Sequence, residues 1–119
     1  MNKAKVVINV AHSLMAEQVE LLNEKFGNDN WERFDVPTEG WTLNEQREIS
    51  DNLNTAVVFA SPLPVMVARL SAKVGASYYT NVGDNCPSEI FVFHNDKREK
   101  KQFGNKIVYV VAQEGWQLV

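Results

Sequence analysis

The chain has 119 residues, 45% of them hydrophobic, and a formal net charge of −3 at pH 7. This length fits one domain with a modest core, and the acidic balance argues against a protein that coats duplex nucleic acid. The single cysteine, Cys86, excludes an intramolecular disulfide and favours a reducing cytoplasm. No apolar run approaches the roughly 18 residues of a membrane helix, and no signal-peptide pattern is present, which argues against a membrane protein.

The first third of the chain predicts a strand, a helix and a second strand. Residues 6–10 are apolar except for Asn9 and predict the first strand, and residues 14–26 repeat apolar side chains at helical spacing. Ser13 is the expected cap of this helix, and Gly27 is its expected end. The alternating residues 31–36 predict the second strand.

The middle of the chain predicts a polar helix between two strands, followed by a third helix. Thr42 and Glu45 are three residues apart, which predicts a capping box for a helix that reaches about residue 53. The apolar run at residues 56–60 predicts a strand that is buried on both faces. A fourth strand is expected at residues 77–82.

The helix between the last two strands is expected to start with Ser61 as its cap and Pro62 in its first position, and to end at Gly75. The β-α-β-α-β-α-β alternation predicts one α/β domain over residues 1–119. Its sheet is parallel with the strand order 2-1-3-4, and helices cover both faces. In a Rossmann-like sheet of this kind, ligands bind outside the carboxyl ends of the strands where the order reverses.

The C-terminal part of the chain predicts strands that follow one another without helices between them. Residues 90–94 and 106–113 are apolar, and the charged segment between them ends in the turn pair Gly104 and Asn105. A further turn at residues 114–115 leads into the last residues. We expect an antiparallel extension that either completes the edge of the sheet or reaches another subunit.

Polar side chains follow the first and third strands, whose ends meet at the expected crevice. Asn9, His12 and Ser13 suit a phosphodiester ligand or substrate, because histidine moves protons near neutral pH and an amide holds a hydroxyl or phosphate. The alternative is that Ser13 caps a helix and His12 is an ordinary loop residue. Ser61 and Pro62 form the second turn, where the free N–H groups of a helix start can hold an anion or simply be capped.

The remaining candidates have equally plain alternatives. Tyr79 and Asn81 end the fourth strand, where they either contact a base or pack in the core and at the edge. Arg69 and Lys73 share a helix face, but they lie toward the wrong end for a phosphate and are expected to complement the helix dipole. No spacing predicts a metal or cofactor site. The one strong basic run either reaches a polyanion or is a solvated hairpin tip; it comprises Lys97, Arg98, Lys100 and Lys101.

Two segments resemble a known family. The segment INVAHSL at residues 8–14, followed by Glu17 and Gln18, resembles the N-terminus of small CRISPR-associated proteins of type III systems. The segments FASPLPV at residues 59–65 and GASYY at residues 75–79 resemble the central strand, turn, helix and strand of the same proteins. That family comprises Rossmann-like relatives of the cyclic-oligoadenylate-sensing (CARF) domains and includes ring nucleases.

The resemblance implies a homodimer that binds a cyclic oligoadenylate, with cyclic tetra-adenylate on the two-fold axis, and takes part in antiviral defence. It implies cleavage without a metal, in which a ribose 2′-hydroxyl attacks the neighbouring phosphate. Asn9 and His12 would then be catalytic, Ser13 and Ser61 would bind the ligand, and Asn81 would line the base pocket. Two alternatives stay open: a module that sequesters the nucleotide without cutting it, and an interaction protein with no nucleotide ligand.

Overall fold

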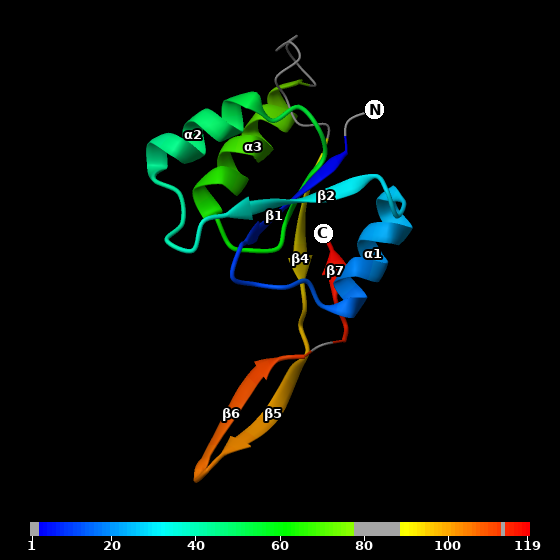
Figure 1. Ribbon diagram of the computed structural model, residues 1–119, viewed down its shortest axis with the longest axis vertical. Helices are drawn as coiled ribbons and strands as arrows, with labels where there is room; N and C mark the ends of the chain where they lie inside the picture. The colour runs from blue at the N-terminus through cyan, green and yellow to red at the C-terminus, as the bar shows by residue number, and fades with distance from the viewer. Residues whose placement is uncertain (1–2, 78–88, 113) are drawn as a thin grey trace.

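The computed structural model describes residues 3–77, 89–112 and 114–119 of the chain (Figure 1). Three helices and seven strands are assigned within these ranges. In chain order they are β1 (Ala4–Asn9), α1 (Ala16–Phe26), β2 (Trp31–Val36), α2 (Leu43–Asn52), β3 (Val57–Phe59), α3 (Pro64–Ser77), β4 (Ile90–His94), β5 (Arg98–Phe103), β6 (Lys106–Val111) and β7 (Gln117–Leu118).

The main sheet has five strands in the order β2-β1-β3-β4-β7. β1 runs parallel to β2 and β3, β3 runs parallel to β4, and only β7 is antiparallel to its neighbour. Val6 and Val7 point to opposite faces and both are fully buried, so the sheet is covered on both sides. The predicted mostly parallel α/β sheet with the order 2-1-3-4 is confirmed.

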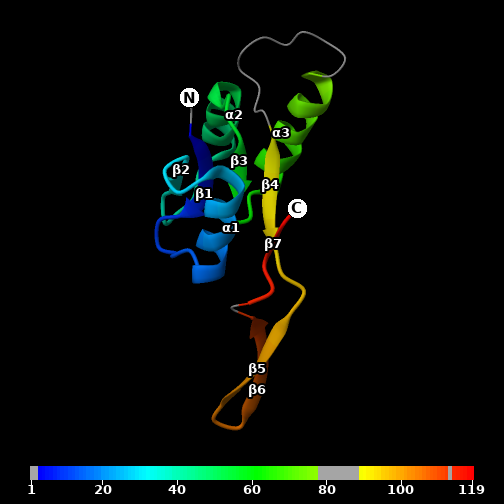
Figure 2. The ribbon, with the colours of Figure 1, turned by 90° about the vertical axis from the view of Figure 1, so that its right-hand side faces the viewer.

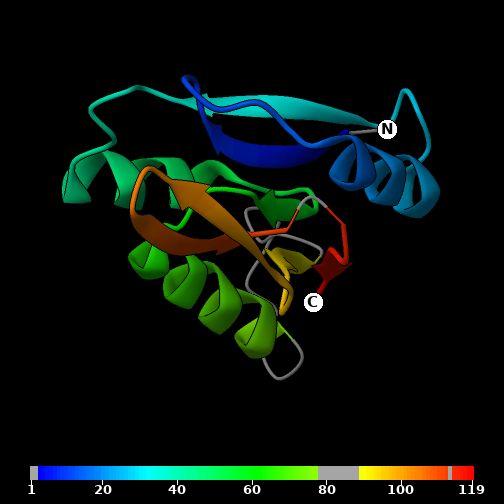
Figure 3. The same ribbon diagram turned by 90° about the horizontal axis from the view of Figure 1, so that it is seen from below.

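Helix α1 covers one face of this sheet, and α2 and α3 cover the other (Figure 3). On the α1 side, Leu22 packs with Val6 and Val58. On the opposite side, Met66 and Leu70 of α3 belong to a second apolar cluster. The apolar periodicity of the helices therefore faces the sheet, as the sequence predicts. None of the described helices has both the length and the apolar content needed to cross a membrane.

The strand in the fourth position differs from the one predicted. It is β4, in which Val92 pairs with Phe59 of β3. Of the strand expected at residues 77–82, Ser77 belongs to α3 and the rest lies outside the described residues. The uninterrupted apolar run of β4 suits a buried parallel strand as well as the antiparallel extension expected above, so periodicity alone does not decide its place.

The predicted cap of α1 is wrong. The helix begins at Ala16 with Met15 in the cap position, and Oε1 of Gln18 accepts a hydrogen bond from the Met15 N–H at 2.9 Å. Ser13 is exposed and precedes the helix by three residues, too far to satisfy its first N–H groups. Gly27 ends the helix as predicted, with a φ of 97° that favours glycine.

The predicted boundaries of α3 are also wrong. The helix begins at Pro64, not at Pro62, because the hydroxyl of Ser61 accepts a hydrogen bond from the Asn9 N–H of β1 and does not cap the helix. It also continues through Gly75. A glycine inside a helix costs about 1 kcal/mol relative to alanine, which weakens a helix without forcing its end.

Two local predictions are confirmed. Thr42 Oγ1 accepts a hydrogen bond from the Glu45 N–H at 3.2 Å, so the capping box of α2 is present. β5 and β6 form an antiparallel hairpin joined by Gly104 and Asn105. This hairpin is a separate two-stranded sheet that projects from the body, and the molecule measures 57 × 32 × 24 Å (Figures 1 and 2).

Candidate functional site

The turns after β1 and β3 meet at the carboxyl ends of these neighbouring strands. Ser61 Oγ accepts a hydrogen bond from the Asn9 N–H at 2.9 Å, and the Ala60 N–H donates to the Val7 carbonyl at 2.9 Å. Ser61 is 8% exposed. Because β1 and β3 leave toward helices on opposite faces, this is the point where the strand order reverses, and the expected meeting of the two turns is observed.

The side chain of Asn9 organises the loops around this point. Its Oδ1 accepts a hydrogen bond from the Ala11 N–H at 2.9 Å, which closes the turn after β1. Its Nδ2 lies 3.3 Å from the Pro37 carbonyl, to which it donates a hydrogen bond. Both ends of the amide therefore contact backbone within the protein. A ligand would have to replace these contacts before Asn9 could hold a ribose or a phosphate.

His12 and Ser13 are exposed on the loop between β1 and α1. Within the described part of the chain, neither side chain makes a hydrogen bond. The loop is held through its backbone, because Nη2 of Arg33 donates to the His12 carbonyl at 3.0 Å. Nε of Arg33 donates to Asp35 at 2.8 Å, which orients the guanidinium. Arg33 was not among the predicted site residues, since a charged residue within a short strand gives no sign of a contact 21 residues away.

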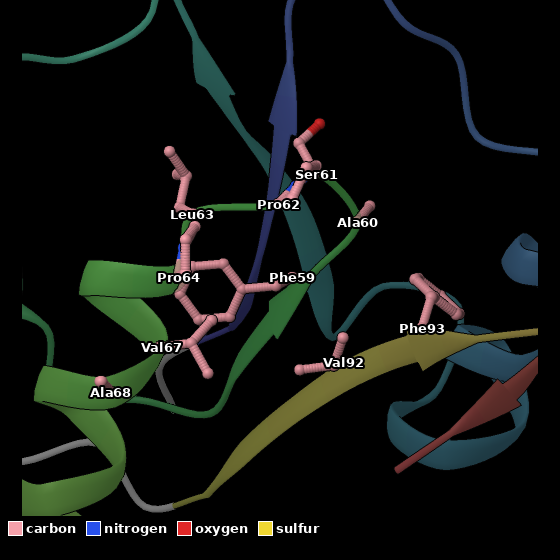
Figure 4. Close-up of a pocket in the computed structure, with 10 residues that line it drawn as sticks. All are labelled: Phe59, Ala60, Ser61, Pro62, Leu63, Pro64, Val67, Ala68, Val92 and Phe93. Atoms are coloured by element: carbon pink, nitrogen blue, oxygen red, sulfur yellow. The ribbon is translucent and has the colours of Figure 1, made fainter.

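An apolar pocket of about 480 Å³ lies beside the second turn (Figure 4). We call it the apolar pocket. It is bounded by the ends of β3 and β4, the loop between β3 and α3, and the first turns of α3. Its lining residues are Phe59, Ala60, Ser61, Pro62, Leu63, Pro64, Val67, Ala68, Val92 and Phe93. Ser61 is the only polar side chain among them, and its hydroxyl is already bonded to β1.

The apolar pocket lies at β3 and β4, whereas the loop that carries His12 follows β1, the neighbour of β3. Ser61 and Pro62 line the pocket, whereas Asn9, His12 and Ser13 do not. The structure brings the two predicted turns together, but the cavity that they border is formed by β3, β4 and α3. The apolar segments on either side of Ser61 are the sequence signal for this cavity, but apolar segments of this kind also predict ordinary core packing.

The start of α3 adjoins this cavity, which Pro64 lines. The Leu63 carbonyl accepts the first helical hydrogen bond, from the Val67 N–H at 3.0 Å. Pro64 has no N–H, so helix geometry leaves the N–H groups of Val65 and Met66 without an intrahelical acceptor. These donors and the positive end of the helix dipole favour an anion near this position.

The cations of α3 have a different role. Lys73 Nζ lies 2.8 Å from Asp51 Oδ1 of α2, and Arg69 Nη2 lies 3.2 Å from the same oxygen. These hydrogen bonds, first that of Lys73 and then that of Arg69, hold the pKa of Asp51 below its ordinary value of 3.8. Arg69 and Lys73 tie α3 to α2. The expectation that they complement the helix dipole is wrong, because α3 continues to Ser77 and its last turn holds no basic residue. Their acidic partner was not predicted.

Tyr79, Asn81 and Cys86 lie outside the described residues, so their predicted roles stay predictions. Within the described ranges, no group of three or more histidine, cysteine, aspartate or glutamate side chains could hold a metal ion. No protein-family model matches the chain, and no similar curated protein or solved structure is found. The apolar pocket therefore offers apolar surface to a flat apolar group, and the adjoining start of α3 offers a backbone donor to an anion.

Proposed function

We propose that the chain binds a cyclic oligoadenylate, with cyclic tetra-adenylate as the first candidate, and holds it without cutting it. The observation that carries this proposal is the apolar pocket at the start of α3. Its volume of about 480 Å³ is in the range of small-molecule sites, which are roughly 300–1,000 Å³. The sequence resemblance described above supports the same class of ligand and a Rossmann-like origin of the sheet.

The apolar lining of the pocket suits the base of a nucleotide, and the adjoining start of α3 suits its phosphate. Phe59, Val67 and Val92 present apolar surface against which an adenine ring would pack. The N–H of Val65, which is exposed at the start of α3 beside the pocket, would then donate to a neighbouring phosphate. A cyclic oligoadenylate repeats base and phosphate around a ring, so two copies of the chain related by a two-fold axis would offer it two equivalent pockets.

The lining of the pocket favours binding over cleavage. General acid–base catalysis needs a group that transfers a proton within hydrogen-bond reach of the reacting atom. Ser61 is the only polar side chain among the lining residues, and its hydroxyl is bonded to Asn9. His12 is outside the lining. Cleavage by the ribose 2′-hydroxyl with help from His12 and Asn9 therefore remains a prediction, and sequestration is the function that the geometry supports better.

Calorimetric titration of the chain with cyclic tetra-adenylate tests the proposal. Ala60→Phe adds a ring to the lining of the pocket and should weaken binding by at least about tenfold. Tenfold is about 1.4 kcal/mol, and the loss of two methylene-sized contacts at about 0.8 kcal/mol each already exceeds it. Ala72→Phe is the matched control. Ala72 is exposed on α3 but does not line the apolar pocket, so this variant should bind as the wild type does.

Recovery of the labelled ring after incubation separates the remaining alternatives. Intact ring that is bound by the wild type and released on denaturation supports sequestration. A linear product with a cyclic phosphate end, lost in His12→Ala, would instead support the ring nuclease. An absence of binding at micromolar concentrations would refute both forms of the proposal and favour an interaction protein with no nucleotide ligand.

A further inference from the structure

The hairpin formed by β5 and β6, which we call the hairpin arm, has too little structure of its own to be stable in isolation. Its two strands pair only with each other among the described strands. Two-stranded hairpins are marginally stable in water unless a third strand or a packed face supports them. Figure 2 shows the arm pointing away from the main sheet, so the body of the same chain does not cover it.

One face of the hairpin arm combines apolar and cationic side chains. Residues that pair directly across an antiparallel ladder share a face. Gln102 pairs with Ile107, Lys100 with Tyr109, and Arg98 with Val111, so three apolar side chains of β6 lie beside polar and cationic side chains of β5. Ile107, Tyr109 and Val111 are 53%, 69% and 39% exposed. Exposed apolar side chains gathered in this way mark an interaction surface.

The arm and the rest of the chain carry opposite charge. The arm, residues 98–111, holds four of the 12 lysines and arginines but one of the 15 acidic residues, which gives a net charge of +3. The other residues hold eight basic and 14 acidic side chains, a net charge of −6. Among the described residues, Lys100 and Lys101 form no ion pair, so their charges remain available for a partner.

A groove of matching chemistry lies at the start of α1. Its volume is about 390 Å³, and we call it the glutamate groove; it is lined by Met15, Ala16, Glu17, Glu20 and Glu114. Glu17 is structural, because its Oε1 accepts hydrogen bonds from the N–H groups of Gly115 and Trp116, both at 2.9 Å. Glu20 is exposed and has no ion-pair partner among the described residues.

The base of the arm is fixed relative to this groove. Asn95 is 6% exposed, and its Nδ2 donates to the carbonyls of Ala112 and Glu114 at 2.9 and 3.0 Å. Its Oδ1 accepts a hydrogen bond from the Lys97 N–H at 2.8 Å. The strands that enter and leave the arm are therefore clamped together, and the arm is an oriented projection.

The geometry points to an assembly in which the hairpin arm of one copy of the chain docks in the glutamate groove of a second copy, and the reverse contact forms by two-fold symmetry. Lys100 would meet Glu20 and Glu114, and the exposed face of β6 would cover Met15 and Ala16. In such a dimer the arm of each copy contacts the groove of the other, so both arms are buried by the same pair of surfaces. This is the arrangement of an isologous interface. The acidic groove and the apolar face of β6 favour a second copy over a nucleic acid.

The proposed function assumes two copies of the chain, and this assembly says which surfaces of the two copies meet. It rests on the proposed function only for the assumption that there are two copies. It needs no ligand, so its test does not depend on nucleotide binding. The mass of the full chain in solution, measured by light scattering and analytical ultracentrifugation without any nucleotide, should be that of a dimer. The dimer should weaken in about 1 M salt, where the screening length falls to about 3 Å.

A charge exchange tests which surfaces meet. Lys100→Glu and Glu20→Lys should each weaken the dimer by about tenfold or more, because each places like charges opposite one another. The combined variant should recover part of the affinity lost in either single variant, since the pair of residues 20 and 100 is restored with its signs reversed while Glu114 is unchanged. Glu48→Lys makes the same charge change on exposed α2, away from the groove, and is the matched control.

The apolar half of the contact has its own test. Ile107→Thr with Tyr109→Thr keeps the β propensity of β6 but removes its exposed apolar surface, and should dissociate the dimer while the far-ultraviolet circular dichroism stays unchanged. A monomeric wild type would overturn the assembly, and so would a failure of the charge exchange to recover any affinity. A monomer that binds single-stranded oligonucleotides through Lys100 would identify a nucleic acid as the partner of the arm instead.

Discussion

Replacement of Ser61 by alanine should destabilise the fold more than any other serine-to-alanine change near the site. The substitution removes the oxygen that accepts the Asn9 N–H at 2.9 Å and leaves that donor without a partner between the ends of β1 and β3. A buried unsatisfied donor costs about 1–3 kcal/mol. Asn9 is only half-buried, so partial solvation of the freed N–H puts the expected loss at about 1–2 kcal/mol.

The matched control is Ser13→Ala, because both serines lie in the loops that follow neighbouring strands and both were predicted to cap a helix. If Ser13 capped α1, its loss would cost about 0.5–2 kcal/mol. In the structure Met15 occupies the cap position, and the Ser13 side chain is exposed. Ser13→Ala should therefore change the free energy of unfolding by less than about 0.5 kcal/mol, the usual range for surface substitutions.

Urea unfolding followed by circular dichroism measures both effects. With a denaturant slope of about 2 kcal/mol per molar, Ser61→Ala should lower the unfolding midpoint by about 0.5–1 M, and Ser13→Ala should leave it unchanged. Equal shifts in the two variants would refute the assignment of Ser61 as the link between the strands. A larger shift in Ser13→Ala would restore the helix cap that the sequence predicts.

Three further predictions concern other parts of the fold. Leu22→Ala should cost about 2–5 kcal/mol, because Leu22 is fully buried between α1 and the sheet; a loss below 1 kcal/mol in urea unfolding would contradict this packing. Gly27→Ala should cost about 1–3 kcal/mol, since φ is 97° and the added Cβ would lie 2.9 Å from Asn30 Nδ2; a stabilised variant would exclude this backbone geometry. The Asp51 carboxyl should titrate below 3.8 by NMR, so its ion pair should stabilise the fold above that pH and be lost as the pH falls through the lowered folded pKa. Lys73→Met should move the Asp51 pKa back toward 3.8, and an unmoved pKa would show that Lys73 is not its main partner.

The strand order was predictable because it depends on local patterns and general rules. Apolar runs place β1 and β3 in the buried centre, and right-handed crossovers leave few ways to connect them. The position of β4 was not predictable in the same way. Residues 77–82 and Ile90–His94 both have the composition of a strand, and only the pairing of Val92 with Phe59 identifies the second as the neighbour of β3.

The details of the site depend on contacts between residues far apart in the chain. Ser61 has the sequence context of a helix cap, but its hydroxyl bonds to a backbone group 52 residues away. Asp51 and Lys73 are 22 residues apart, and Arg33 reaches the carbonyl of His12 across 21 residues. Local propensity rules consider only residues that are close in the chain. They predict that a buried polar group makes a hydrogen bond, but they do not identify a partner that is distant in the chain.

The apolar pocket and the glutamate groove are separate surfaces, yet a short chain of contacts joins them. Phe93 lines the pocket and packs edge-to-face on Trp116, with ring centroids 6.1 Å apart. The backbone N–H of Trp116 donates to Oε1 of Glu17 in the groove. If docking of a hairpin arm displaces Trp116, the affinity of the pocket changes, and linkage requires the ligand to change the dimer affinity by the same factor. Equal dimer affinities with and without cyclic tetra-adenylate would mean that Phe93 and Trp116 pack together without coupling the two surfaces.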